Sequence, residues 1–136
     1  MGAQRVGKGF PGDLVLDAGA LIAFERGDER VRGLLKTALA LRSRILVPAT
    51  VLAQGWRGGP GAAPLARLLD SGELDLLDEA RAKQVGVRLG ERSERDITDA
   101  HVVCCAMQCR AAIATSDPVD IRGLAGPGER LTIIPL

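Results

Sequence analysis

Residues 14–28 read LVLDAGALIAFERGD, and this stretch decides the fold class. Its opening LVLDA is a short aliphatic run that ends in an acid, which predicts a buried strand over residues 14–18. The following GALIAFERGD predicts a short helix, and Gly27 is the kind of residue that stops one. A strand that leads directly into a helix is the repeating unit of α/β proteins, so the stretch favours that class.

The same alternation continues along the chain. We expect further strands at residues 44–48, 73–77, 111–117 and 131–136, separated by helices at 28–44, 49–56, 63–72, 78–93, 96–110 and 118–126. In ELDLL (73–77) acids alternate with leucines, which predicts a half-exposed strand near an edge. Helices between all strands require parallel pairing through right-handed crossovers. The sequence therefore predicts a three-layer α/β/α sandwich over residues 13–136, preceded by a flexible tail over 1–12.

Composition narrows the functional classes. The chain has 18 basic and 17 acidic residues and a net charge of +1, so no overall field marks a nucleic-acid or membrane binder. Trp56, Phe10 and Phe24 are its aromatic residues, which leaves little for stacking on bases. No run of 18 apolar residues is present, so we expect no membrane association. Three cysteines inside the apolar run 104–109 do not suggest a disulfide framework, and we expect a reducing cytoplasm.

Four acids are expected to meet at one edge of the sheet. Asp17 ends the first strand and Asp117 ends the fourth, and parallel strands end at the same edge. Asp96 and Asp99 occupy the first turn of the helix that leads into the fourth strand, so they begin at that edge too. Packed carboxylates repel one another unless a cation compensates, and such hard oxygen ligands suit Mg²⁺ or Mn²⁺. The pattern indicates metal-assisted hydrolysis of a phosphodiester.

Each of these acids also has a structural interpretation. Asp17 and Asp96 could cap the helices that follow them, and a helix dipole favours Asp99 in a first turn. Asp117 before Pro118 fits a cap ahead of a proline at the first helical position. Their convergence from three separate stretches favours the functional interpretation.

Four motifs resemble those of the PIN domains, in particular the VapC-like toxins of bacterial toxin–antitoxin pairs. They are LDAGALIA (16–23), VPATVLAQGW (47–56), DAHVV (99–103) and TSDPVDIRGLA (115–125). The resemblance covers nearly the whole chain. It implies a parallel sheet of strand order 3-2-1-4-5 and a Mg²⁺- or Mn²⁺-dependent ribonuclease that acts on RNA. It also implies a small antitoxin whose tail blocks the site, and a homodimer.

The motifs assign roles by position. The resemblance implies that Asp17, Asp99 and Asp117 are metal-binding or catalytic acids. By the same motifs Thr115 would be a supporting hydroxyl and Asp120 a less regular acid. Asp96 lies outside the motifs and is a further candidate ligand from its expected position alone. Guanidinium groups near the motif loops could pair with RNA phosphates, and the candidates are Arg26, Arg57 and Arg122, with Arg30 and Arg32 nearby.

Gln54 departs from the family pattern, because the second motif usually carries a glutamate at this position. An amide oxygen can contact a water or a metal, but it cannot neutralise an ion or act as a base. Two interpretations follow: a nuclease with weakened metal binding, or a catalytically weak or inactive PIN-like binding or regulatory module. Other α/β hydrolases fit less well. Haloacid dehalogenase-like phosphatases need a second aspartate two residues after the first, where this chain has Gly19.

His101, Cys105 and Cys109 follow one another at four-residue spacing, which suggests a zinc site. Eight residues of helix span about 12 Å, however, which is too far for three ligands of one tetrahedral ion. We expect the cysteines, Cys104 included, to pack as small hydrophobic side chains. We expect His101 to lie beside the acids, in reach of a proton or a substrate.

Overall fold

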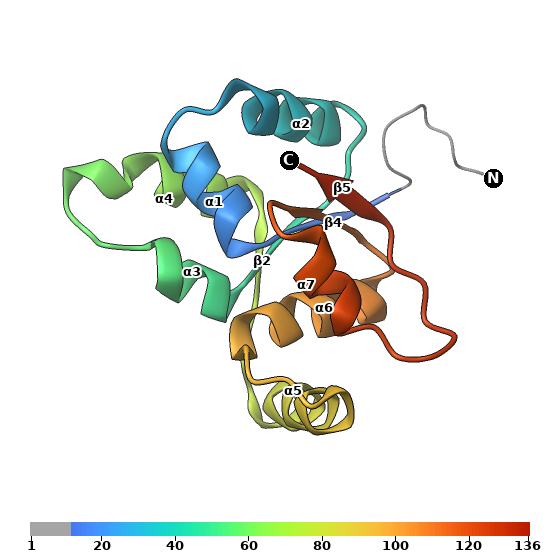
Figure 1. Ribbon diagram of the computed structural model, residues 1–136. Helices are drawn as coiled ribbons and strands as arrows, with labels where there is room; N and C mark the ends of the chain where they lie inside the picture. The colour runs from blue at the N-terminus through green and yellow to red at the C-terminus, as the bar shows by residue number, and fades with distance from the viewer. Residues whose placement is uncertain (1–11) are drawn as a thin grey trace.

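A computed structural model describes residues 12–136 (Figure 1), so residues 1–11 of the predicted tail lie outside the described part. Five strands form one parallel sheet in the order β3-β2-β1-β4-β5. They are β1 (Leu14–Leu16), β2 (Ile45–Pro48), β3 (Glu73–Asp75), β4 (Ala112–Thr115) and β5 (Ile133–Pro135). The predicted α/β class, the strand order 3-2-1-4-5 and the edge position of β3 are all confirmed.

A helix is found wherever one was predicted, although several ends differ by a few residues. The helices are α1 (Ala18–Glu25), α2 (Glu29–Ala40), α3 (Ala49–Gly55), α4 (Ala63–Ser71), α5 (Glu79–Arg92), α6 (Ile97–Cys109) and α7 (Pro118–Gly123), and a 3₁₀ turn, η2 (Pro60–Ala62), precedes α4. Right-handed crossovers place α1 to α4 over one face of the sheet and α5 to α7 over the other (Figure 1). α1 packs on α3, and α5 packs on α6.

Aspartates fix where several helices begin. The Asp28 carboxylate accepts a hydrogen bond from the Val31 amide (3.1 Å), and the Asp78 carboxylate accepts one from the Arg81 amide (2.8 Å). Each bond satisfies an amide that has no partner inside its own helix.

No helix in residues 12–136 has the length and hydropathy needed to cross a membrane.

The core surrounds the three central strands. All residues of β1, β2 and β4 are buried, and Leu14, Leu16 and Ile113 are among the largest fully buried side chains. Burying one such side chain contributes about 1.5–3 kcal/mol. Cys104 and Cys105 belong to this core, as predicted for small hydrophobic side chains. β3 is largely exposed, as its alternating acids and leucines predicted.

Candidate active site at the carboxyl edge of the sheet

Asp17 lies directly after β1 at the centre of the carboxyl edge, and its side chain is only 4% exposed. Its Oδ1 accepts a hydrogen bond from the Ala20 amide (2.7 Å), so Asp17 does cap α1. The Thr115 hydroxyl and the Ser116 amide also lie beside this carboxylate, and their hydrogen-bonding groups lower its pKa. Burial raises the pKa of Asp17 above its usual value although these bonds oppose the change, and the nearby Asp117 adds to it. The carboxylate is therefore rigidly held but costly to ionise.

Asp99 lies in the first turn of α6 and is half-buried. Burial raises its pKa to about 6, and repulsion from four other carboxylates adds to the rise. Those carboxylates belong to Asp96, Asp17, Asp120 and Asp117. We call these five residues the acidic cluster. The topology predicted that Asp17, Asp96, Asp99 and Asp117 would meet, and in the structure all of them and Asp120 lie close enough for their charges to act on Asp99.

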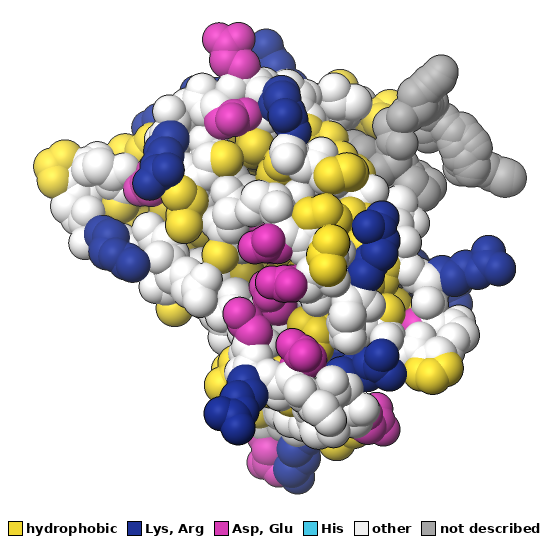
Figure 2. Space-filling view, viewed as in Figure 1, with side chains coloured by type: hydrophobic (Ala, Val, Ile, Leu, Met, Phe, Trp, Pro, Cys, Tyr) yellow, Lys and Arg dark blue, Asp and Glu magenta, His cyan; other side chains and the backbone are white. Residues whose placement is uncertain are grey.

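Two members of the acidic cluster flank Asp99 from different helices. The Asp96 carboxylate caps α6 by accepting a hydrogen bond from the Asp99 amide (2.9 Å). Asp117 occupies the equivalent position before α7, but among the described residues its carboxylate makes no capping bond. Instead its amide donates to the Thr115 hydroxyl (2.8 Å), which shapes the turn after β4. Asp117 and Asp120 are exposed, and Figure 2 shows acidic side chains gathered near the middle of this face, with Lys and Arg side chains farther out.

Gly19 brings the start of α1 against the turn after β4. A Cβ atom at this position would collide with the Ser116 hydroxyl and would lie 3.1 Å from the Ser116 Cβ. It would also lie 3.5 Å from Oδ1 of Asp17. A residue without a side chain is therefore needed for this close approach. From the sequence, Gly19 spoke only against a phosphatase, and nothing in its neighbours along the chain indicated this contact with Ser116.

The donor chemistry of the acidic cluster fits a hard divalent cation. A cation would relieve the repulsion that raises the pKa of Asp99, and carboxylate oxygens are its preferred ligands. Within residues 12–136, no group of three or more His, Cys, Asp and Glu side chains is arranged so that it could hold a metal ion. Gln54, in α3, is exposed, and its side chain makes no hydrogen bond with the described residues.

The three arginine candidates lie apart from one another. Arg26 is the C-cap of α1, so the eight residues of that helix, about 12 Å, separate it from Asp17. Arg57 donates from Nη1 to the Trp56 carbonyl (2.9 Å) and folds back on the end of α3. Arg122 is exposed in the last turn of α7. The fold does not assemble them into one basic patch.

The expectation that His101 lies in reach of a proton or substrate is wrong. The ring is 0% exposed, with Nδ1 2.9 Å from the Thr50 hydroxyl and Nε2 2.8 Å from Oδ2 of Asp75. Successive helical residues are turned by about 100°, so two residues after Asp99 the side chain points toward the core. Burial lowers the pKa of His101 although the bond to Asp75 opposes the change.

Asp75 is a further acid at this edge and was not among the predicted site residues. Asp75 ends β3 at the carboxyl edge, but the predicted strand over residues 73–77 placed it in mid-strand, so the strand-end rule that selected Asp17 and Asp117 passed over it. Arg81 holds Asp75 with two hydrogen bonds, 2.9 Å to Oδ2 and 3.0 Å to Oδ1. Burial would raise the pKa of Asp75, but the bonds from Arg81 and His101 outweigh it and lower the pKa. Asp75 is thus an ion-paired structural acid and not a member of the acidic cluster.

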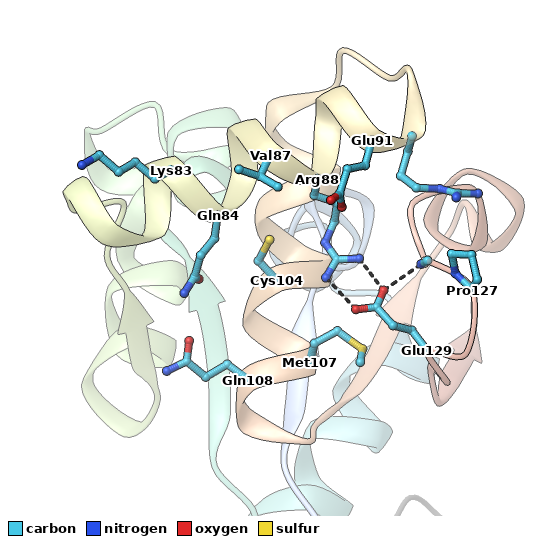
Figure 3. A pocket seen from close by; sticks show the side chains of 12 residues that line it. Lys83, Gln84, Val87, Arg88, Glu91, Cys104, Met107, Gln108, Pro127 and Glu129 are labelled. Atoms are coloured by element: carbon cyan, nitrogen blue, oxygen red, sulfur yellow. Dashed lines mark hydrogen bonds and ion pairs between the residues drawn. The ribbon is translucent and has the colours of Figure 1, made fainter.

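Two open grooves lie away from the acidic cluster. One, of about 720 Å³, runs between α5, α6 and the segment before β5. Figure 3 shows Arg88 and Glu129 joined across it by bonds of 2.6 and 3.1 Å, with Cys104 and Met107 nearby. The other, of about 750 Å³, is lined by residues of α1, α2 and α4. No member of the acidic cluster lines either groove, so neither is the candidate active site.

Solved structures supply the comparison with known proteins. No protein-family model matches the sequence, and no curated protein sequence matches it. The crystal structure of VapBC2 from Rickettsia felis, bound to a DNA fragment from its promoter, contains a chain with a TM-score of 0.67 and 14% identity, covering 90% of this chain and 98% of that one. A chain in the structure of FitAB bound to an IR36 DNA fragment has a TM-score of 0.64 and 16% identity, and the match covers 90% of this chain and 94% of that one. A chain in the crystal structure of FitAcB from Neisseria gonorrhoeae has a TM-score of 0.58 and 17% identity, and the match covers 88% of this chain and 95% of that one. At these identities the likeness establishes a shared PIN-like fold over nearly the whole chain.

Proposed function

We propose that the chain is a Mg²⁺- or Mn²⁺-dependent endoribonuclease, the toxin of a type II toxin–antitoxin pair. The observation that carries the proposal is the acidic cluster, in which burial and four neighbouring carboxylates raise the pKa of Asp99 to about 6. Asp17 and Asp96 also cap helices, but capping does not explain why carboxylates that repel one another share one edge, whereas a bound cation would offset that repulsion.

Asp17, Asp99 and Asp117 would hold the cation, and Asp96 and Asp120 would add negative charge around it. When bound, a divalent cation lowers the pKa of a water and stabilises the charge that develops on the phosphate. The Ala20 amide holds the Asp17 carboxylate by its hydrogen bond to Oδ1, and Thr115 and Ser116 lie beside it. Asp99 releases its proton as the pH rises through about 6, which adds one negative charge to the acidic cluster.

The substrate and the partner follow from the resemblance to VapC-like toxins and from the fold shared with VapBC2 and FitAB. We infer that the substrate is RNA, with Arg26, Arg57 and Arg122 contacting phosphates outside the acidic cluster. A small antitoxin would occupy the site, and the toxin would form a homodimer in the cytoplasm. Three unpaired cysteines among the described residues suit that reducing compartment.

A second function has one observation in its favour. Gln54 stands where the family pattern has a glutamate, and a neutral amide lowers the negative charge available to a cation. A PIN-like module that binds RNA or a partner protein without cleaving it would tolerate this change. Metal binding separates the two functions.

The nuclease is tested with purified protein and a mixed-sequence RNA in Mg²⁺, Mn²⁺ or EDTA. We expect cleavage only with metal, and its loss in Asp17→Asn and Asp117→Asn. Asp70→Asn is the matched control, because Asp70 is an exposed acid of α4 outside the acidic cluster. Cleavage in EDTA, or unchanged cleavage by the two site variants, would overturn the assignment.

Calorimetry with Mn²⁺ decides between the nuclease and the binding module. For a nuclease, wild type binds Mn²⁺ and Gln54→Glu binds it more tightly. If wild type binds no Mn²⁺ and Gln54→Glu does, the chain is the binding module.

A further inference from the structure

A hydrogen bond between Thr50 and His101 joins the two helical layers. Thr50 lies in the first turn of α3 and His101 in the second turn of α6. These helices cover opposite faces of the sheet and contact each other where both begin, at the carboxyl edge. The 2.9 Å bond from the Thr50 hydroxyl to Nδ1 of His101 therefore spans the edge at which the acidic cluster lies.

The partners of His101 fix the direction of this bond. Asp75 accepts from Nε2 at 2.8 Å, so Nε2 carries the proton of the neutral ring and Nδ1 is an acceptor. The Thr50 hydroxyl is then the donor. Asp75 is held in turn by Arg81, whose Nη1 donates to Gln84 (2.6 Å) and Gln108 (2.7 Å). The chain of bonds thus anchors the ring to β3, α5 and α6 before it reaches α3.

The bond connects the two helices that carry the second and third motifs. Thr50 precedes Gln54 by one helical turn, so both residues lie on the same side of α3. His101 follows Asp99 by two residues on α6. Any shift of α3 against α6 would stretch the bond between Thr50 and His101, and it would also move Gln54 relative to Asp99.

We infer that His101 is a positioning residue of the acidic site, which sets the place of Gln54 relative to Asp99 through its hydrogen bond with Thr50. The inference rests on the proposed metal-dependent function. A fully buried imidazole bonded at both nitrogens is a costly way to fill a core, but hydrogen bonds specify one arrangement of neighbouring helices more sharply than apolar contacts do.

The test compares Thr50→Val with Thr50→Ser. Valine keeps the shape of threonine but removes the donor, whereas serine keeps the hydroxyl. Thr37→Val is the matched control, since Thr37 is an exposed helical threonine whose hydroxyl bonds within α2 to the Gly33 carbonyl.

Two readouts are measured on the full chain. Hydrogen exchange of the α3 amides reports how firmly that helix is held in place, whether or not the protein is a nuclease. We expect their protection to fall about tenfold in Thr50→Val, the effect of an unsatisfied buried acceptor, while β1 and β4 stay protected. Mn²⁺ affinity should fall about tenfold or more, as when groups that orient metal ligands are removed. Thr50→Ser should restore both readouts to within about twofold of wild type.

A second pair of variants tests the ring itself. In His101→Asn the side-chain amide replaces Nδ1 and can still accept from Thr50, whereas in His101→Gln it replaces Nε2 and can reach Asp75. The inference requires His101→Asn to keep α3 protection and Mn²⁺ affinity better than His101→Gln does.

The outcomes distinguish the inference from the proposed function. Wild-type α3 protection and Mn²⁺ affinity in Thr50→Val, or an equal loss in Thr50→Ser, would overturn the positioning role. A wild-type protein that binds no Mn²⁺ and cleaves no RNA would overturn the proposed function. Hydrogen exchange would then still show whether His101 fixes α3.

Discussion

Asp99→Asn should stabilise the metal-free protein at neutral pH. The raised pKa means that ionising this carboxyl costs the folded state free energy that it does not cost the unfolded chain. Asparagine has nearly the same shape and carries no charge, so the repulsion within the acidic cluster falls without a new cavity.

The pKa rises from 3.8 to about 6, and a shift of this size corresponds to about 3 kcal/mol if nothing screens it. Asp99 is only half-buried, and screening by solvent reduces this to about 1–1.5 kcal/mol. Losing a negative charge from the first turn of α6 offsets about 0.3–1 kcal/mol. We therefore expect a net gain of up to about 1 kcal/mol, or up to roughly 5 °C in Tm.

The sign of the pH dependence is specific. The folded pKa of Asp99 lies above the unfolded one, so ionisation of this residue lowers the stability of wild type as the pH rises from about 4 to about 6, and the variant lacks this contribution. The advantage of Asp99→Asn should be present at pH 7.5 and absent near pH 3.5, where the aspartate is protonated in both states.

Urea unfolding in EDTA at both pH values measures this difference. Glu29→Gln is the control, because Glu29 is an exposed first-turn acid of α2 outside the acidic cluster and should show no stabilisation. A variant that is less stable than wild type at pH 7.5, or equally stabilised at both pH values, would refute the crowding of Asp99.

Two further predictions concern other parts of the molecule. Gly19→Ala should destabilise the protein by about 1–3 kcal/mol, because the added Cβ collides with Ser116. In a double-mutant cycle, Ser116→Ala should recover part of this lost stability. Fully additive effects of the two substitutions would contradict the contact. Glu129→Gln should lower the stability by about 1–2 kcal/mol at pH 7 and by nothing near pH 2. The bond with Arg88 lowers the pKa of Glu129 to about 2, so the stability that this bond provides is lost as the pH falls from about 4.5 toward 2. Denaturation curves at both pH values test this prediction.

The fold was predictable because each local signal has a single physical cause. The run LVL is too short and apolar for anything but a buried strand, and Asp28 and Asp78 mark helix starts that their side chains do cap. Gly27 lies just beyond α1 with a φ of 83°, a conformation that glycine adopts without strain. Helix ends were less certain, because the last turns of α1 and α2 carry no sequence signal that separates them from the connection that follows.

The site was predictable only as far as topology reaches. Strand ends gave Asp17 and Asp117, and the start of α6 gave Asp96 and Asp99. The same rule passed over Asp75, because the strand was predicted to continue to residue 77 and ends at Asp75 instead. The ion pair of Asp75 with Arg81 was not predictable either, because it depends on how α5 packs beside β3. The orientation of the His101 ring was not predictable for a similar reason. Helical spacing shows on which face of α6 a side chain lies, but the hydrogen-bond partners on that face come from distant segments.

The pairing of β1 with β4 bears on how the protein is made. Asp17 leaves the ribosome early, whereas Thr115, Ser116 and Asp117 emerge near the end of the chain, and only the contact between these two strands brings them together. Since translation adds about 5–20 residues per second, a nascent chain spends seconds with its first acid and without its last. The acidic edge therefore closes late, and a ribosome would hold an incomplete site for most of the time that it takes to synthesise the protein.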